Sequence, residues 1–187
     1  MHTNKFEPKF LSLSNKLGRI AWQIVWLVLF RPTPRVFHAW RCFLLRLFGA
    51  NLGKSVHIYP SAHIWAPWNL EMGDHSCIGE RVDCYSVGKI HIGAYSTISQ
   101  YCFLCSSSHD YTLAEMPLIF SPIFIGENVW ITADVFIGPG VTIGEGAVVT
   151  ARSSVFSNIP PWVVASGNPA RPARIRKFNI SKDVLNG

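Results

Sequence analysis

One aliphatic side chain recurs at every sixth position over much of the sequence. The spacing is unbroken at Ile125, Ile131, Ile137, Ile143, Val149 and Val155. An α-helix would repeat its apolar residues every three to four positions, and a half-buried strand would alternate them. A period of six instead fits a coil of three short parallel strands, one on each face of a triangular prism. We therefore expect a mainly β chain that folds as a parallel β-helix.

The repeat also runs upstream, with a longer period. Leu52, Met72 and Ile92 lie 20 residues apart, which is three hexads plus two extra residues at one corner. A glycine often follows the aliphatic residue, and we expect it to ease a tight corner. The position four residues after the aliphatic one should also point inward, as at Val129, Val135, Val141, Ala147 and Ser153. We assign residues 51–170 to the β-helix and residues 171–187 to a C-terminal tail.

The repeat is interrupted once, in front of Ile125. This residue lies 33 positions after Ile92, where three hexads would span 18, so 15 surplus residues must leave the prism. We place this external loop at about residues 110–122, with His109 at its base. Long loops on a rigid scaffold often carry function. His109 is the candidate catalytic base, because an imidazole takes up a proton near neutral pH; the alternative is a structural histidine bonded to a backbone carbonyl.

The positive charge of the chain is concentrated near its N-terminus. Nine Lys or Arg and one acid fall within residues 1–54, whereas residues 55–187 carry eight Lys or Arg and ten acids. A nucleic-acid-binding protein would be expected to carry this charge on its folded body, so we predict no nucleic-acid partner. A basic flank that contains Trp22, Trp26 and Trp40 favours contact with anionic lipid.

Residues 1–50 are predicted to form a helical extension, with two helices in the segment 15–48. Two prolines separate the helices, because proline fixes φ and lacks an amide donor. We expect Ser14 to cap the first helix, Thr33 to cap the second and Gly49 to end it. These helices could cap the prism, lie in a membrane interface, or do both. The basic residues of the second helix are Arg35, Arg41 and Arg46.

The five cysteines argue against a structural metal site. Cys102 and Cys105 form a lone CxxC, and neither a second cysteine pair nor a histidine pair stands at zinc spacing. We therefore expect free thiols in a reducing cytoplasm and no bound metal.

Several stretches carry a resemblance to a known family. The segments "PIFIGENVWITADVFIGPGVTIGEGAVVTARSSV" and "IPPWVVASGNPARPARIR" resemble the C-terminal half of the galactoside, maltose and nodulation O-acetyltransferases. The segments "FRPTPRVFHAWRCFLLRLFGANLG" and "ISQYCFLCSSSHDY" more specifically resemble the colanic-acid-type O-acetyltransferases of bacterial polysaccharide synthesis. Together the resemblance covers residues 15–177.

The resemblance implies a left-handed β-helix and a homotrimer with active sites between neighbouring prisms. It implies acetyl-CoA as the donor and a carbohydrate hydroxyl as the acceptor, in exopolysaccharide or capsule synthesis. His109 would deprotonate that hydroxyl, which would attack the thioester directly. The basic helices add the hypothesis of a cytoplasmic protein held peripherally at the inner face of the membrane, with a lipid-linked acceptor.

The resemblance also assigns residues around His109. We expect Asp83 of one subunit to orient His109 or the sugar on its neighbour, the alternative being a solvated corner aspartate. The acceptor-side candidates are Tyr85, Ser107, Ser108, Asp110 and Trp130, the last of which could equally be ordinary packing. The pantetheine arm is expected near Ala133 and Ala151. Arginines replace a family lysine that this chain lacks, and the candidates are Arg152, Arg171 and Arg174.

Three other interpretations stay open from the sequence. A zinc hydratase of the γ-carbonic-anhydrase type would need three histidines; His91 and His109 could stack, but no third histidine stands at ligand spacing. A non-catalytic scaffold would dock a membrane polysaccharide complex through the basic N-terminus. A sugar-nucleotide N-acetyltransferase would use the same base chemistry on an amine.

Overall fold

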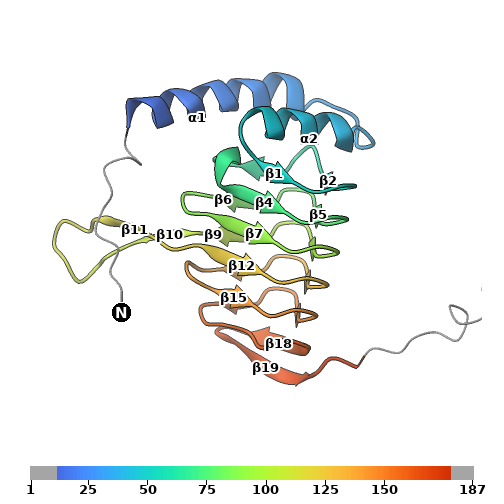
Figure 1. Ribbon diagram of the computed structural model, residues 1–187. Coiled ribbons are helices and arrows are strands. Elements are labelled where there is room, and N and C mark those ends of the chain that lie inside the picture. The colour runs from blue at the N-terminus through green and yellow to red at the C-terminus, as the bar shows by residue number, and fades with distance from the viewer. Residues whose placement is uncertain (1–11, 178–187) are drawn as a thin grey trace, which may run out of the picture.

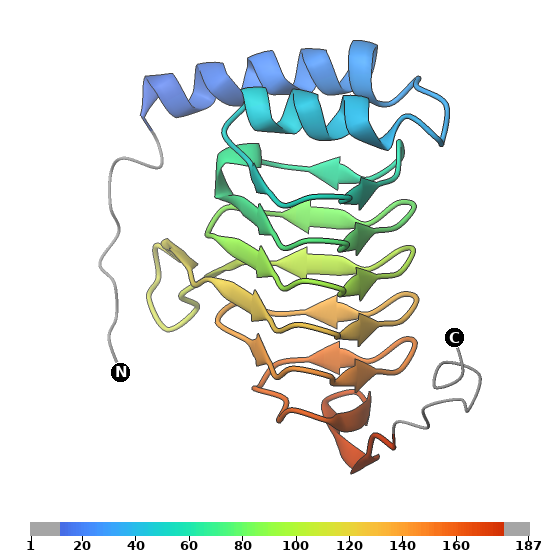
Figure 2. The same cartoon turned by 45° about the vertical axis from the view of Figure 1, so that its right-hand side comes forward.

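The computed structural model describes residues 12–177, which form a three-sided prism closed at one end by two helices (Figures 1 and 2). Each turn of the prism, here called a coil, contributes one short strand to each of three parallel sheets. Face A contains β1 (Asn51–Leu52), β4 (Leu70–Met72), β7 (Ile90–Ile92), β12 (Ile123–Ile125) and β15 (Thr142–Ile143). Face C contains β3 (His63–Ile64), β6 (Asp83–Tyr85), β9 (Phe103–Cys105), β14 (Phe136–Ile137) and β17 (Ser154–Val155).

Face B is the longest sheet and includes the C-terminal end of the described chain. It contains β2 (His57–Ile58), β5 (Cys77–Ile78), β8 (Thr97–Ile98), β13 (Trp130–Ile131), β16 (Val148–Val149), β18 (Val163–Gly167) and β19 (Ala170–Ile175). The last pair is antiparallel. Residues 171–175, which were predicted to lie in the C-terminal tail, therefore belong to the sheet. Residues 178–187 of the predicted tail lie outside the described range.

The strand register confirms the repeat read from the sequence. Leu52 pairs with Met72, which pairs with Ile92, and Ile92 pairs with Ile125 across the interruption. These side chains fill the interior together with their equivalents on faces B and C. The small residues four positions on, such as Val129, are buried as well. The fold class is therefore confirmed: a mainly β chain folded as a β-helix behind an N-terminal helical extension.

The corner glycines serve a different purpose from the one expected. Gly53, Gly73, Gly93, Gly126 and Gly144 follow the face A strands, yet none of them has positive φ. A Cβ built on Gly93 would lie 2.5 Å from the backbone carbon and oxygen of Gly126 in the next coil. The positive φ values fall two residues later, for example at His75 and Tyr95. Glycine is thus required for the close approach of successive coils, and not for its conformational freedom.

This packing predicts a large cost for one methyl group. Gly93→Ala should destabilise the protein by about 3 kcal/mol, because two backbones must move apart in a continuous stack. Gly138→Ala is the matched control, since its Cβ would meet its nearest neighbour, the carbonyl of Val155, at an ordinary 3.4 Å. Thermal unfolding of both variants tests the prediction. Equal melting temperatures would show that the coils are not held at this separation.

The N-terminal helices close the prism. The first runs through α1 (Leu13–Val25) and a π-helical turn, η2 (Trp26–Phe30), and the second is α2 (His38–Leu47). Trp22 and Phe30 are fully buried beneath them. The indole of Trp22 donates to the carbonyl of Ile64, and that of Trp26 donates to the carbonyl of Ala62. Two of the three tryptophans assigned to lipid contact therefore anchor the helices to the prism instead.

Both predicted helix caps are wrong. Ser12, rather than Ser14, caps α1 by accepting the amide of Asn15. The second helix begins at His38, too far from Thr33 for a cap, and the Thr33 hydroxyl donates to the carbonyl of Phe30. In residues 12–177 no helix has both the length and the apolar character needed to cross a membrane.

The interruption forms a hairpin, here called the arm (residues 107–120). It consists of β10 (Ser107–His109) and β11 (Leu118–Phe120), which pair antiparallel so that His109 lies opposite Leu118. The arm leaves the prism between β9 on face C and β12 on face A and projects sideways (Figures 1 and 2). A short 3-10 turn, η3 (Pro67–Asn69), fills one of the two-residue insertions at the same corner two coils above.

Candidate active site

His109 lies in the first strand of the arm, exposed to solvent. Its Nδ1 lies 2.6 Å from the backbone carbonyl oxygen of Met116, across the hairpin. A carbonyl oxygen can only accept, so Nδ1 carries the hydrogen and Nε2 keeps its lone pair. The arm therefore holds the imidazole in the tautomer that presents a base at Nε2.

The serines before His109 fasten the arm to the prism. Ser106 is fully buried; its hydroxyl donates to the carbonyl of Tyr85 and accepts the amide of Gly88. Ser107 is buried beside it, and Ser108 is exposed next to the histidine. This anchoring makes the first strand of the arm a rigid support.

Asp110 has a structural task within the arm. Its Oδ1 accepts hydrogen bonds from both the amide and the hydroxyl of Thr112. The hydroxyl and amide of Thr112 lower the pKa of the Asp110 carboxyl. Its charge therefore persists to lower pH while it stabilises the turn.

Asp83 and Tyr85 lie on face C rather than on the arm. The Oδ1 of Asp83 is 3.2 Å from the Nδ1 of His63, whose Nε2 lies 3.0 Å from the side-chain amide nitrogen of Gln23. Because that amide donates, His63 accepts at Nε2 and donates to Asp83 from Nδ1. Within one chain Asp83 is therefore bonded to His63, and His109 to Met116.

An aromatic stripe runs down the outside of face C. Successive ring centroids lie 5.4–6.3 Å apart along it. Its members are Trp65, Tyr85, Phe103, Phe136 and Phe156. Phe156 is 59% exposed, and the other four are half-buried. Such a contiguous apolar strip on a prism face is typical of a surface that another chain covers.

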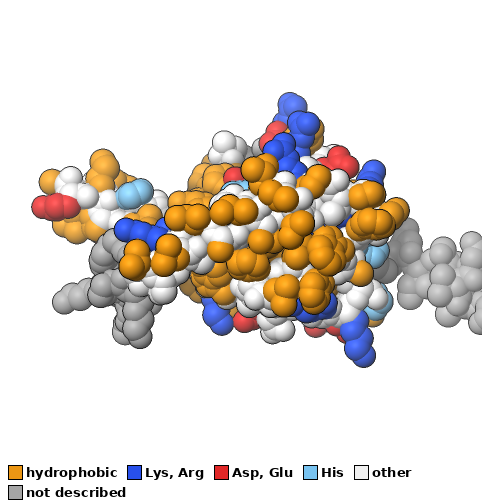
Figure 3. All heavy atoms as spheres, turned by 90° about the horizontal axis from the view of Figure 1, so that it is seen from above, with side chains coloured by type: hydrophobic (Ala, Val, Ile, Leu, Met, Phe, Trp, Pro, Cys, Tyr) orange, Lys and Arg blue, Asp and Glu red, His pale blue; other side chains and the backbone are white. Residues whose placement is uncertain are grey.

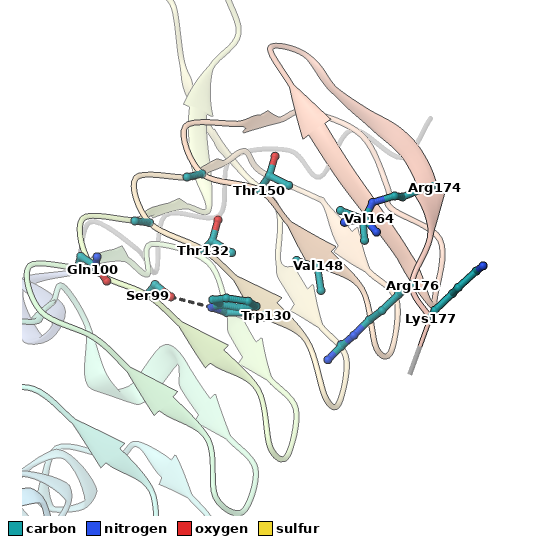
Figure 4. A pocket seen from close by; sticks show the side chains of 12 residues that line it. Ser99, Gln100, Trp130, Thr132, Val148, Thr150, Val164, Arg174, Arg176 and Lys177 are labelled. Carbon is teal, nitrogen blue, oxygen red and sulfur yellow. Dashed lines mark hydrogen bonds between the residues drawn. The ribbon is translucent and has the colours of Figure 1, made fainter. Parts of the chain in front are cut away.

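A groove of about 690 Å³ follows the corner between faces B and C (Figure 4). Ala133 and Ala151, the two predicted pantetheine contacts, lie in its wall, and Trp130 stands at one end with its indole donating to the hydroxyl of Ser99. Arg174 and Lys177 of the C-terminal segment stand at the other end. Arg176 also lines the groove, and its Nη1 donates to the carbonyls of Asn128 and Gly146. The groove is therefore lined by small, aliphatic and hydroxyl side chains along its length and is basic at one end.

The other two predicted arginines lie outside this lining. Arg152 is exposed and lies 3.5 Å from Asp134. Arg171 donates to the hydroxyl of Ser157 and to the carbonyl of Ala170. The structure thus brings Arg174 to the groove and leaves Arg152 and Arg171 engaged elsewhere.

Eight lining residues were not identified from the sequence: Ser99, Gln100, Thr132, Val148, Thr150, Val164, Arg176 and Lys177. Two of them carried a usable signal. Thr132 and Thr150 each follow an inward aliphatic residue and lie 18 positions apart, one full coil, so both had to lie on the same corner. The others come together only through the fold.

Within the described part of the chain, the histidines and cysteines do not assemble into a metal-ligand set. Among residues 12–177 no three His, Cys, Asp or Glu side chains cluster as metal ligands would. His91 lies 3.5 Å from Glu71 on face A. Burial raises the pKa of the Cys102 thiol to about 11. These groups provide no support for the zinc hydratase interpretation.

Comparisons with known proteins agree with this geometry. No protein-family model matches the chain. It is 47% identical over 169 residues to a protein of Escherichia coli assigned as the colanic acid biosynthesis acetyltransferase WcaF, covering 90% of this chain and 93% of that one. A maltose O-acetyltransferase structure from Clostridium difficile has a TM-score of 0.82 and 26% identity, covering 90% and 91% of the two chains. A hexapeptide-repeat acetyltransferase of Vibrio cholerae, in complex with acetyl coenzyme A, has a TM-score of 0.81 and 29% identity, covering 92% and 93%.

Proposed function

The chain belongs to the hexapeptide-repeat acetyltransferases, in their colanic-acid type, and from this we propose that it moves an acetyl group from acetyl-CoA to a carbohydrate hydroxyl in bacterial exopolysaccharide or capsule synthesis. The observation that carries the proposal is the groove between faces B and C, which is basic at one end and has Ala133 and Ala151 in its wall. Its volume is in the range of sites for ligands of this size.

The donor would lie along the groove in one direction. Arg174 and Lys177 would bind the phosphates of CoA, since cationic side chains form charge-assisted hydrogen bonds with phosphate oxygens. The pantetheine arm would run past Ala151 and Ala133 toward Trp130. This orientation places the thioester at the end of the groove away from the cations.

One arginine pair on β19 tests this placement. Arg174→Ala should raise the Kd for acetyl-CoA about tenfold, the loss of one charge-assisted hydrogen bond. Arg171→Ala is the matched control and should leave the Kd unchanged, because Arg171 is bonded to Ser157 outside the groove. Calorimetric titration measures both. A loss confined to Arg171→Ala would contradict this orientation and favour the placement expected from the sequence.

We propose a single direct transfer. Nε2 of His109 takes the proton of the acceptor hydroxyl as its oxygen attacks the carbonyl carbon of the thioester. The C–O bond forms, the tetrahedral intermediate collapses, and the C–S bond breaks. The thiolate of CoA then takes the proton from Nε2, which restores the base. No protein group other than the imidazole needs to change its protonation.

The arm and the groove lie on different edges of one prism, so a neighbouring subunit is needed to join them. The arm leaves at the corner of faces C and A, and the groove follows the corner of faces B and C. In a trimer whose C faces point toward the threefold axis, the arm of one subunit meets the groove of the next. The aromatic stripe would then be covered, as would the exposed apolar residues of the arm: Tyr111, Leu113, Met116 and Ile119.

Asp83 takes a place at this junction. It begins β6 at the groove edge of face C, so in the trimer it would face the neighbour's arm and could orient His109 or the sugar. Asp83→Asn should lower kcat about tenfold, with KM for acetyl-CoA unchanged. Asp74→Asn, a corner aspartate whose oxygen accepts the amide of Lys54, is the control. Unchanged turnover in Asp83→Asn would leave Asp83 a solvated corner residue bonded to His63.

The reaction itself is tested by acceptor-dependent release of CoA. The protein is incubated with acetyl-CoA and a panel of saccharides and amino sugars, and CoA and acetylated products are separated chromatographically. O-acetylated sugar supports the proposal. Acetylation confined to amino groups would favour a sugar N-acetyltransferase. Acetyl-CoA binding with no transfer to any acceptor of the panel would leave the carbohydrate acceptor unsupported.

A further inference from the structure

The outward side of the two N-terminal helices is an apolar surface, here called the roof (Figure 3). Along α1 and η2 it consists of Leu13, Leu17, Ile20, Ile24, Leu27 and Val28. Beside and along α2 it consists of Val36, Phe37, Trp40, Phe43 and Leu47. Each of these side chains is between 41% and 77% exposed. Contiguous apolar area on this scale marks an interaction site.

The fold of the prism does not account for the roof. The opposite side of the same helices already closes the prism through Trp22, Phe30 and Leu45, which are fully buried. Positions 13, 17, 20 and 24 follow the helical repeat on the face turned away from these contacts. The first helix is therefore apolar on two sides, one serving the fold and one unpartnered.

The segment that carries the roof has charge of only one sign. The sequence contains no Asp or Glu from residue 8 to residue 70. Lys16, Arg31 and Arg46 are exposed on or beside the helices, whereas Arg35 lies 3.8 Å from Glu80 of the prism. An amphipathic helix with Lys or Arg beside a broad apolar face is the pattern that binds anionic lipid, through apolar burial and electrostatic attraction together.

We propose that the roof docks on the surface of an anionic bilayer, with both helices lying in the interface and the prism standing away from it. The proposal deepens the proposed function and rests on it in one respect. In the trimer described above the three prism axes run parallel, so three roofs lie on the same side and bind one membrane together. Such multivalent contact strengthens attachment well beyond that of one roof.

This orientation determines how far His109 lies from the membrane surface. The arm leaves the prism after the third coil, so His109 stands about 20 Å from the helix axes, given a layer spacing of about 10 Å and two strand spacings of about 4.8 Å. An acceptor anchored in the bilayer would have to extend across that distance to reach the Nε2 atom. A lipid-anchored glycan fits this requirement better than a lipid that carries a single sugar.

Vesicle cosedimentation tests the docking. The full-length protein is mixed with vesicles of phosphatidylcholine, with and without phosphatidylglycerol. Wild type should bind the anionic vesicles more strongly, and Leu17→Glu combined with Ile24→Glu should weaken this binding at least tenfold, since two apolar contacts are replaced by charges that anionic lipid repels. A matched double variant, Phe124→Glu combined with Ile175→Glu, changes two exposed apolar residues away from the roof and should bind as wild type does.

Two further measurements separate the outcomes. Sedimentation velocity reports whether a second copy covers the roof: a wild-type assembly whose mass halves in the roof variant would overturn membrane docking. So would wild type that stays in the supernatant with both kinds of vesicle. Acetyl-CoA titration of the roof variant should match wild type. If wild type failed to bind acetyl-CoA, that result would count against the proposed function. The vesicle measurement would still decide whether the roof docks on a membrane.

Discussion

Replacing His109 with alanine is expected to lower kcat for acetyl transfer by about 10²- to 10⁴-fold, the usual contribution of a positioned general base. The affinity for acetyl-CoA should not change, because the proposed role of His109 is toward the acceptor hydroxyl and it is not among the residues proposed to bind CoA. Acceptor-dependent release of CoA and calorimetric titration measure the two quantities separately.

A second substitution at the same position distinguishes chemistry from structure. In His109→Asn the side-chain amide can still donate to the carbonyl of Met116, so the arm keeps its cross-strand hydrogen bond, but no basic atom replaces Nε2. Turnover in this variant should fall as far as in His109→Ala. Near-normal turnover in His109→Asn would mean that the histidine only supports the arm.

Replacing Arg41 with methionine is expected to produce the largest loss of stability in the helical extension. Arg41 is fully buried, and it donates to the hydroxyl of Thr33 and to the carbonyls of Pro34, Arg35 and Ile58. Methionine fills a similar volume but leaves these acceptors unsatisfied. The expected cost is about 3 kcal/mol, which lowers Tm by about 6–12 °C for a chain of this size.

Arg46 on the same helix is the control for this prediction. It is exposed, and it donates to the carbonyls of Leu52 and Gly53. Arg46→Met should cost under about 1 kcal/mol, because water can replace a lost donor at the surface. Thermal unfolding of the two variants gives the comparison. Equal shifts in Tm would show that Arg41 is not the anchor of the loop between the helices.

The coils were predictable because their periodicity is a direct consequence of geometry. Each hexad crosses one face, so a repeated aliphatic such as Ile131 has only one place to point, and counting residues from Ile92 to Ile125 locates the arm. The role of Arg41 was not predictable by the same reasoning. A helical pattern of charges reads as a solvated face, and only the tertiary path of the loop at 31–37 places backbone carbonyls around that guanidinium.

The candidate site likewise has residues that the sequence could identify and residues that it could not. His109 stands out in the sequence because it follows small residues at a break in the repeat. The arginines do not, because the turn that leads into β19 decides which of them reach the groove. Arg171 pairs with Ser166 and Arg174 pairs with Val164, with a bulge between the two pairs, so simple alternation along the strand does not decide which arginine lines the groove. Composition alone treats these arginines as equivalent.

The most direct test of the account is a calorimetric titration of the full-length wild-type protein with acetyl-CoA, which requires no knowledge of the acceptor. Saturable binding with one molecule per chain is the predicted result, because every groove lies at an equivalent junction of the proposed trimer. Absence of binding at millimolar acetyl-CoA would contradict the central claim: the prism would remain, and the groove with its basic end would need a different ligand.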